Sequence, residues 1–144
     1  MIQYPLYFQV ESKAQRGIQS QWATLTPGNP EAACAIPPEF EGPGGGYSPE
    51  DFFAMAMANC FVATFKVIAE KSKVEFESLR VAGRLTVDRN EKGQPWMAAI
   101  HLIVEVQPGA TDPARIQRTL EKTSQSCIVA HSLKTPVSFE FKIA

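Results

Sequence analysis

SPEDFFAMAMANCFVATFKVIAEKS, residues 48–72, is the segment that decides the fold. Its first residue, Ser48, favours the N-cap of a helix, and Pro49 suits the first helical position. Asp51 follows Ser48 by three residues, as in a capping box, and acidic residues suit the positive end of the helix dipole. The segment therefore predicts one long helix that begins here and ends near Lys71 or Ser72.

Apolar side chains surround this predicted helix and leave it no polar face. They are Phe52, Phe53, Met55, Met57, Cys60, Phe61, Val62, Phe65, Val67 and Ile68. A helix of this kind must be buried on every side. Because one sheet of a 144-residue chain covers only one side of it, the rest requires a second copy, and the sequence predicts a homodimer.

Membranes and nucleic acids are not expected as partners. The charge-free stretch Phe52–Phe65 has 14 residues, too few to span a bilayer. The N-terminus shows neither the basic region nor the apolar run of a signal peptide, so we expect a cytoplasmic protein. Fourteen Lys and Arg against 15 Asp and Glu give a net charge of −1, which argues against binding to nucleic acid or to an anionic membrane surface.

The rest of the chain predicts an α+β fold with a mostly antiparallel sheet, in a single domain over residues 1–144. Alternating or apolar runs predict strands at Tyr4–Val10, Ile18–Leu25, Leu79–Asp88, Trp96–Gln107 and Pro136–Ile143. A second helix is expected after Thr111-Asp112-Pro113, and a short helical piece after Cys127. Residues 27–49 hold six prolines and five glycines and are expected to form an irregular connector.

No cofactor or metal motif is present in the sequence. The glycines at 42–46 are not followed by the Lys-Ser or Lys-Thr of a phosphate-binding loop, and the dinucleotide-binding glycine spacing is missing. Two histidines, without an HxxxH or a CxxC pattern, make a zinc site unexpected. We therefore expect a protein that needs neither cofactor nor metal.

The three cysteines can be either core residues or reactive thiols. Cys60 lies on the predicted buried helix and Cys127 beside apolar residues, and a buried cysteine is more often a small core residue. Cys34 falls in the Pro/Gly-rich segment and is taken as incidental. His131 follows Cys127 by four residues and could accept its proton, although a surface position is the commoner outcome; His101 is expected to point outward.

Two motifs resemble those of a known family. Residues 48–61, SPEDFFAMAMANCF, place Cys60 ten positions after Glu50, and residues 127–133, CIVAHSL, provide a second cysteine near the C-terminus. This combination is similar to the OsmC/Ohr family of osmotically induced and organic-hydroperoxide-resistance proteins. The resemblance covers nearly the whole chain. It implies a sheet wrapped on a long central helix in an intertwined homodimer.

The resemblance also implies an activity in an antioxidant role, the thiol-dependent reduction of organic hydroperoxides, with inorganic ones as a second substrate class. Cys60 would attack the peroxide, Cys127 would resolve the sulfenic acid to a disulfide, and an external dithiol would reduce it. Arg16, held by Glu50, would supply the cation that stabilises the Cys60 thiolate. The chain departs from the family at Ile128, where proline is usual, and in the surroundings of Arg16, so it is identified as a divergent member.

Helix geometry adds an expectation about where the site is assembled. Ten residues separate Glu50 from Cys60, about 15 Å along a helix and some 80° around it. In an antiparallel pair of such helices, Glu50 of one subunit lies level with Cys60 of the other, so the site is expected to cross the dimer interface. Two alternatives stay open: a non-enzymatic dimeric binding or structural module, and a hot-dog-like thioesterase with Glu50 or Asp51 as its base.

Overall fold

The computed structural model describes residues 1–144, which divide into two compact units, Met1–Phe52 and Phe53–Ala144. The expected single domain over the whole chain stays a prediction.

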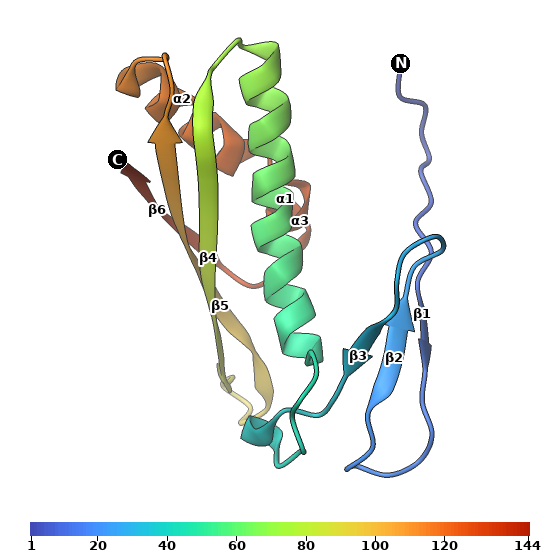
Figure 1. Cartoon of the computed structure of the whole chain (residues 1–144). Coiled ribbons are helices and arrows are strands. Elements are labelled where there is room, and N and C mark those ends of the chain that lie inside the picture. Colours follow the sequence, from blue (N-terminus) through green and yellow to red (C-terminus); the bar gives the residue numbers. More distant parts are fainter. The chain divides into compact units, whose positions relative to one another are not determined.

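The N-terminal unit contains three short strands in one antiparallel sheet of order β1-β2-β3 (Figure 1). They are β1 (Glu11–Lys13), β2 (Trp22–Leu25) and β3 (Ala32–Cys34), and a 3₁₀ turn, η1 (Pro38–Phe40), follows. The chain then returns beside β3, where Tyr47 bridges Cys34. Gly46 permits this approach, because a Cβ there would lie 2.8 Å from the Ala33 carbonyl oxygen.

Three sequence predictions for this unit differ from the structure. Tyr4–Val10 is not a strand: its side chains alternate, but no neighbouring strand pairs with it and Tyr4, Tyr7 and Phe8 are exposed. The second predicted strand, Ile18–Leu25, is shortened to β2. The connector 27–49 is not wholly irregular, because it contains β3 and η1.

The long helix is confirmed as α1 (Pro49–Lys71), with the capping box that the sequence predicted. The Asp51 amide donates to Ser48 Oγ at 3.0 Å, and the Ser48 amide donates to Asp51 Oδ2 at 2.9 Å. At the other end Lys73 adopts a left-handed φ of 55°, and the Val74 amide donates to the Ala69 carbonyl at 2.8 Å. These bonds satisfy backbone groups that a helix end leaves unpaired.

Only one stripe of α1 is buried within the chain: Met57, Phe61, Phe65 and Ala69, each four residues apart. The remaining apolar side chains are half-buried or exposed, and Val67 is 53% exposed. The whole of α1 is longer than the 14-residue charge-free stretch, and by its length and apolar composition it would suit a membrane span. The core helix of a soluble protein passes the same test.

The C-terminal unit has a second three-stranded sheet, made of β4 (Phe76–Arg89), β5 (Pro95–Pro108) and β6 (Val137–Ile143). β4 and β5 form an antiparallel hairpin, whereas β6 runs parallel to β5. Between β5 and β6 lie α2 (Pro113–Ser126) and α3 (Ile128–Ser132). The predicted strands and helices of this half are thus confirmed, with longer bounds for β4.

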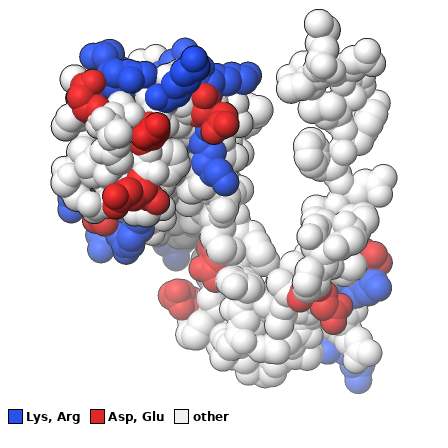
Figure 2. Space-filling view, turned by 45° about the horizontal axis from the view of Figure 1, so that its top comes forward, with Lys and Arg blue, Asp and Glu red and all other residues white.

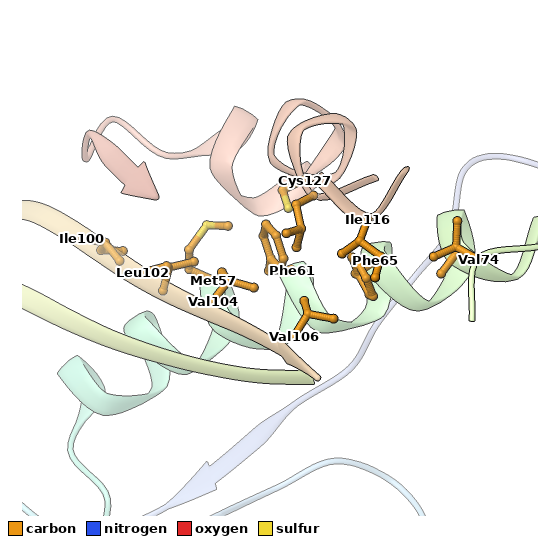
Figure 3. Close-up of a cluster of buried hydrophobic side chains, with 12 residues drawn as sticks. Met57, Phe61, Phe65, Val74, Ile100, Leu102, Val104, Val106, Ile116 and Cys127 are labelled. Atoms are coloured by element: carbon orange, nitrogen blue, oxygen red, sulfur yellow. The ribbon is translucent and has the colours of Figure 1, made fainter. Parts of the chain in front are cut away.

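The core of this unit lies between the sheet and the helices. Alternate residues of β5, Ile100, Leu102, Val104 and Val106, are fully buried and meet the buried stripe of α1 and the inner side of α2 (Figure 3). Phe61 joins α1 to β6 through Phe139, with ring centroids 5.6 Å apart. His101, between two buried positions, points outward as predicted and bonds Ser138 across the sheet at 2.7 Å.

Candidate active site: two neighbouring thiols

Cys60 lies at the rim of the buried stripe of α1. It directly precedes Phe61, so its own side chain is turned partly away from the core and is half-buried. Its Sγ is 4.0 Å from Oγ1 of Thr64, one helical turn further along. The thiol therefore has an apolar side, a hydroxyl neighbour and partial access to solvent.

Cys127 lies at the junction of α2 and α3, where its extended backbone (φ −71°, ψ 113°) ends one helix and begins the next. Its side chain has no exposed area and points into the core beside Phe61 (Figure 3). Its Sγ donates to the Thr123 carbonyl oxygen at 3.2 Å. The residue is therefore held as a buried thiol, with its proton in a defined bond.

The structure brings these two thiols together. Burial first, and the neighbouring Cys60 second, raise the pKa of Cys127 to about 11, although the nearby Thr64 hydroxyl opposes part of the rise. Both cysteines are unpaired. At neutral pH Cys127 is thus protonated, and Cys60 is the more accessible of two adjacent sulfurs.

Cys34 does not lie in an irregular loop, contrary to the sequence interpretation. It lies on β3 of the N-terminal unit, is 1% exposed, and has a pKa raised by burial. The Pro/Gly-rich surroundings concealed a three-residue strand, which is too short for a periodic signal. Cys34 therefore belongs to a different unit from the Cys60 and Cys127 pair.

Arg16 and Glu50 both belong to the N-terminal unit. Arg16 lies between β1 and β2, is exposed, and its carbonyl accepts a bond from Ser20 Oγ at 3.0 Å. Glu50 lies in the first turn of α1 and is half-buried. The single chain forms no ion pair between them, since its three ion pairs join other residues. Their roles toward Cys60 stay predictions.

Other candidate groups are occupied elsewhere. His131 Nε2 lies 2.6 Å from the Gln125 carbonyl, so its ring faces the backbone of α2, and the Cys127 thiol bonds Thr123. Asp51 is engaged in the capping box, which leaves it a poor candidate for a general base. No three His, Cys, Asp or Glu side chains converge in the way a metal ion requires.

Sequence reasoning missed Thr64 and Thr123. Both lie four residues from a cysteine, Thr64 after Cys60 and Thr123 before Cys127. This spacing puts them on the cysteine's own helix face, which is a signal that a scan for neighbours at one helical turn would have found.

Comparison with known proteins relates the sequence of this chain to a family. The family model described as OsmC-like protein matches residues 42–142. The uncharacterized protein YmaD of Bacillus subtilis is 23% identical over 129 residues, covering 88% of this chain and 86% of that protein. The organic hydroperoxide resistance protein of Xanthomonas axonopodis pv. citri is 26% identical over 118 residues, 79% of each chain.

The fold has close counterparts among solved structures. An OsmC-like protein of unknown function from Vibrio cholerae superimposes with a TM-score of 0.85 at 18% identity, covering 95% of this chain and 99% of that one. The fold is therefore the α+β OsmC-like fold, with mostly antiparallel sheets and a long helix.

Proposed function

The chain belongs to the OsmC-like protein family, and from this premise we propose that it is a thiol-dependent peroxidase that reduces organic hydroperoxides. The observation that supports this proposal is the pair of adjacent, unequal thiols. Cys60 is partly accessible, whereas Cys127 is buried in the same core cluster, and the neighbouring Cys60 contributes to its raised pKa, so that it is protonated. A peroxidatic and a resolving cysteine need this division of roles.

The first chemical step takes place at Cys60. Its thiolate attacks the terminal oxygen of the hydroperoxide, so that an S–O bond forms and the O–O bond breaks. The leaving alkoxide takes up a proton and departs as an alcohol, and Cys60 becomes a sulfenic acid. Because Cys60 packs against the hydrophobic core of the C-terminal unit, its surroundings favour an organic substrate.

The second step forms the disulfide. The Cys127 sulfur attacks the Cys60 sulfur, an S–S bond replaces the S–O bond, and the hydroxyl leaves as water with the proton of Cys127. An external dithiol then restores both thiols by exchange. Neither step consumes a bound cofactor.

The proposal assigns Arg16 and Glu50 to the same site in a cytoplasmic homodimer. Arginine offers a permanent charge and a rigid fork, which suit a thiolate and a carboxylate together. Two observations support a second copy: the uncovered apolar side chains of α1, and the N-terminal arm, residues 1–10, which is exposed and carries no charged side chain (Figure 2).

Peroxide consumption with several dithiols tests the activity. Wild type should consume an organic hydroperoxide, Cys60→Ser should fall to the uncatalysed rate, and Cys34→Ser is the matched control that should keep wild-type turnover. Activity that survives Cys60→Ser would refute the proposal, and so would a wild type that is inert with every dithiol.

Mixed dimers test assembly across the interface. Inactive Glu50→Ala and Cys60→Ser chains are denatured and refolded together. If the residues act in trans, one site of the heterodimer carries both defects and the other carries neither, so partial activity should return. If activity stays absent while heterodimers form, the residues act within one chain.

A further inference from the structure

Thr64 places a hydroxyl beside the sulfur of Cys60. Its Oγ1 lies 4.0 Å from Cys60 Sγ. Both residues belong to α1 within the C-terminal unit, and both are half-buried. They directly precede Phe61 and Phe65, which point into the core, so the two side chains lie one helical turn apart at the rim of the buried stripe (Figure 3). The hydroxyl and the thiol therefore share the part of α1 that solvent can reach.

The Thr64 hydroxyl is not used by the backbone of its own helix. A threonine inside a helix can turn its hydroxyl to the carbonyl oxygen four residues earlier. Thr119 and Thr123 of α2 do so, at 2.8 and 2.7 Å. The amide of Asn59, next to Cys60, is occupied in the same way, because it donates to the carbonyl four residues earlier at 2.9 Å. Thr64 makes no such bond, and its hydroxyl faces the sulfur instead.

The distance between the two side chains leaves a place for one further oxygen atom. A separation of 4.0 Å is long for a bond between the hydroxyl and the sulfur themselves. An S–O bond on Sγ, followed by an O–H···O hydrogen bond of about 2.7–2.8 Å, is slightly longer than this separation when the two are added. An oxygen bonded to the Cys60 sulfur can therefore lie at hydrogen-bonding distance from Thr64 Oγ1 along a bent path, without any movement of α1.

We propose that the Thr64 hydroxyl binds the terminal oxygen of the hydroperoxide while that oxygen is transferred to Cys60, an inference that rests on the proposed peroxidase function. The Cys60 thiolate attacks this oxygen, the S–O bond forms, and the electron pair of the O–O bond leaves with the alkoxide, which takes a proton from water. The transferred oxygen keeps its hydrogen and becomes the hydroxyl of the sulfenic acid. Thr64 donates a hydrogen bond to this oxygen, aligns the O–O bond with the sulfur, and is itself unchanged.

The proposed contact is made with the atom that all hydroperoxides share, and this makes it separable from other roles of the side chain. Loss of the hydroxyl should slow the reactions of Cys60 with tert-butyl hydroperoxide and with hydrogen peroxide by similar factors. Iodoacetamide reacts with the same sulfur through a carbon atom, so Thr64 has no oxygen to hold at the reacting position. A hydroxyl that only stabilised the thiolate, or only packed against it, would change the peroxide reactions and the alkylation alike.

The test compares the rates of oxidation and alkylation at Cys60 in reduced protein, each followed by mass spectrometry of the peptide that contains this residue. Thr64→Val removes the hydroxyl at nearly constant shape, Thr64→Ser restores it, and Thr119→Val is the matched exchange on α2. Oxidation by both peroxides should slow by about tenfold in Thr64→Val, the size expected for one hydrogen bond at the reacting atom, while alkylation stays within about twofold. Thr64→Ser and Thr119→Val should keep the wild-type rates of both reactions.

The outcomes separate the role of Thr64 from the function on which it rests. A wild type that is alkylated at Cys60 but oxidised by neither peroxide refutes the peroxidase, and the role of Thr64 with it. A wild type that is oxidised, with an unchanged rate in Thr64→Val, refutes the role of Thr64 alone. Equal losses of oxidation and alkylation in Thr64→Val, or a loss that Thr64→Ser shares, also refute it, because the side chain then acts on the thiol or on packing.

Discussion

The C-terminal unit, Phe53–Ala144, buries its large apolar side chains inside itself, whereas the N-terminal unit, Met1–Phe52, leaves many of its own exposed. Phe61 and Phe65 have no exposed area, while Tyr7 and Phe8 are 83% and 89% exposed. The strands differ in the same way: β4 and β5 have 14 residues each, but β1 and β3 have three. The C-terminal unit is therefore stabilised by apolar side chains that it buries itself, whereas the apolar side chains of the N-terminal unit would be buried only by contact with a partner.

The largest expected effect compares a phenylalanine from each half. Phe61→Ala should lower the free energy of unfolding by about 3–5 kcal/mol, because it leaves a cavity among fully buried neighbours. Phe8→Ala should lower it by much less and act instead on association of the subunits. Urea denaturation followed by circular dichroism, with sedimentation for association, measures both. If Phe8→Ala lowered the free energy of unfolding as much as Phe61→Ala and left association unchanged, the contrast between the two units would be wrong.

A smaller effect is expected for substitution of Arg16, a residue of the N-terminal unit that we propose to act on Cys60 of the C-terminal unit. Arg16→Ala should lower peroxidase activity by more than about tenfold, roughly 1.4 kcal/mol, and slow the alkylation of Cys60. Folding should be unchanged because the side chain is exposed and forms no ion pair in the chain. Lys13→Ala, at a neighbouring exposed base, is the control, and an unaltered alkylation rate would remove Arg16 from the site.

The start of α1, which lies at the end of the N-terminal unit, offers a test of about 1 kcal/mol. Asp51→Ala removes the carboxylate that accepts from the Ser48 amide, and loss of a helix cap costs about 0.5–2 kcal/mol. Glu50→Ala, in the same turn but outside the capping box, should cost less stability while it impairs activity. Thermal unfolding of both variants distinguishes them, and a stability loss larger for Glu50→Ala would contradict the assignment.

The last expected effect appears only in alkali and belongs to the C-terminal unit. Burial raises the pKa of Cys127 from 9.0 to about 11, so the folded protein holds this proton more tightly than the unfolded chain. The resulting stabilisation is full below about pH 9 and is lost as the pH rises toward 11. Urea denaturation of the reduced protein across this range should show that the free energy of unfolding falls more steeply with pH in the wild type than in Cys127→Ala. Parallel curves would contradict the raised pKa.

The same contrast explains what the sequence could predict. α1, β5 and α2 were found because their signals are local: caps, periodicity and prolines at helix starts. Tyr4–Val10 has a strand-like alternation, but alternation does not supply the neighbouring strand that a sheet requires. The spacing of Glu50 and Cys60 was readable along one helix, whereas the position of Cys127 beside Phe61 of α1 depends on how the end of α2 packs into the core.

Because its cysteines differ in burial, the protein should react with an electrophile at only one of its thiols. Three thiols are present, but Cys34 and Cys127 are 1% and 0% exposed, and burial raises the pKa of both. A maleimide applied to the native, reduced protein should therefore couple to Cys60 alone, and the other two thiols should react only after denaturation. A dye or a covalent inhibitor could thus be attached at a single, known atom without removing any native cysteine.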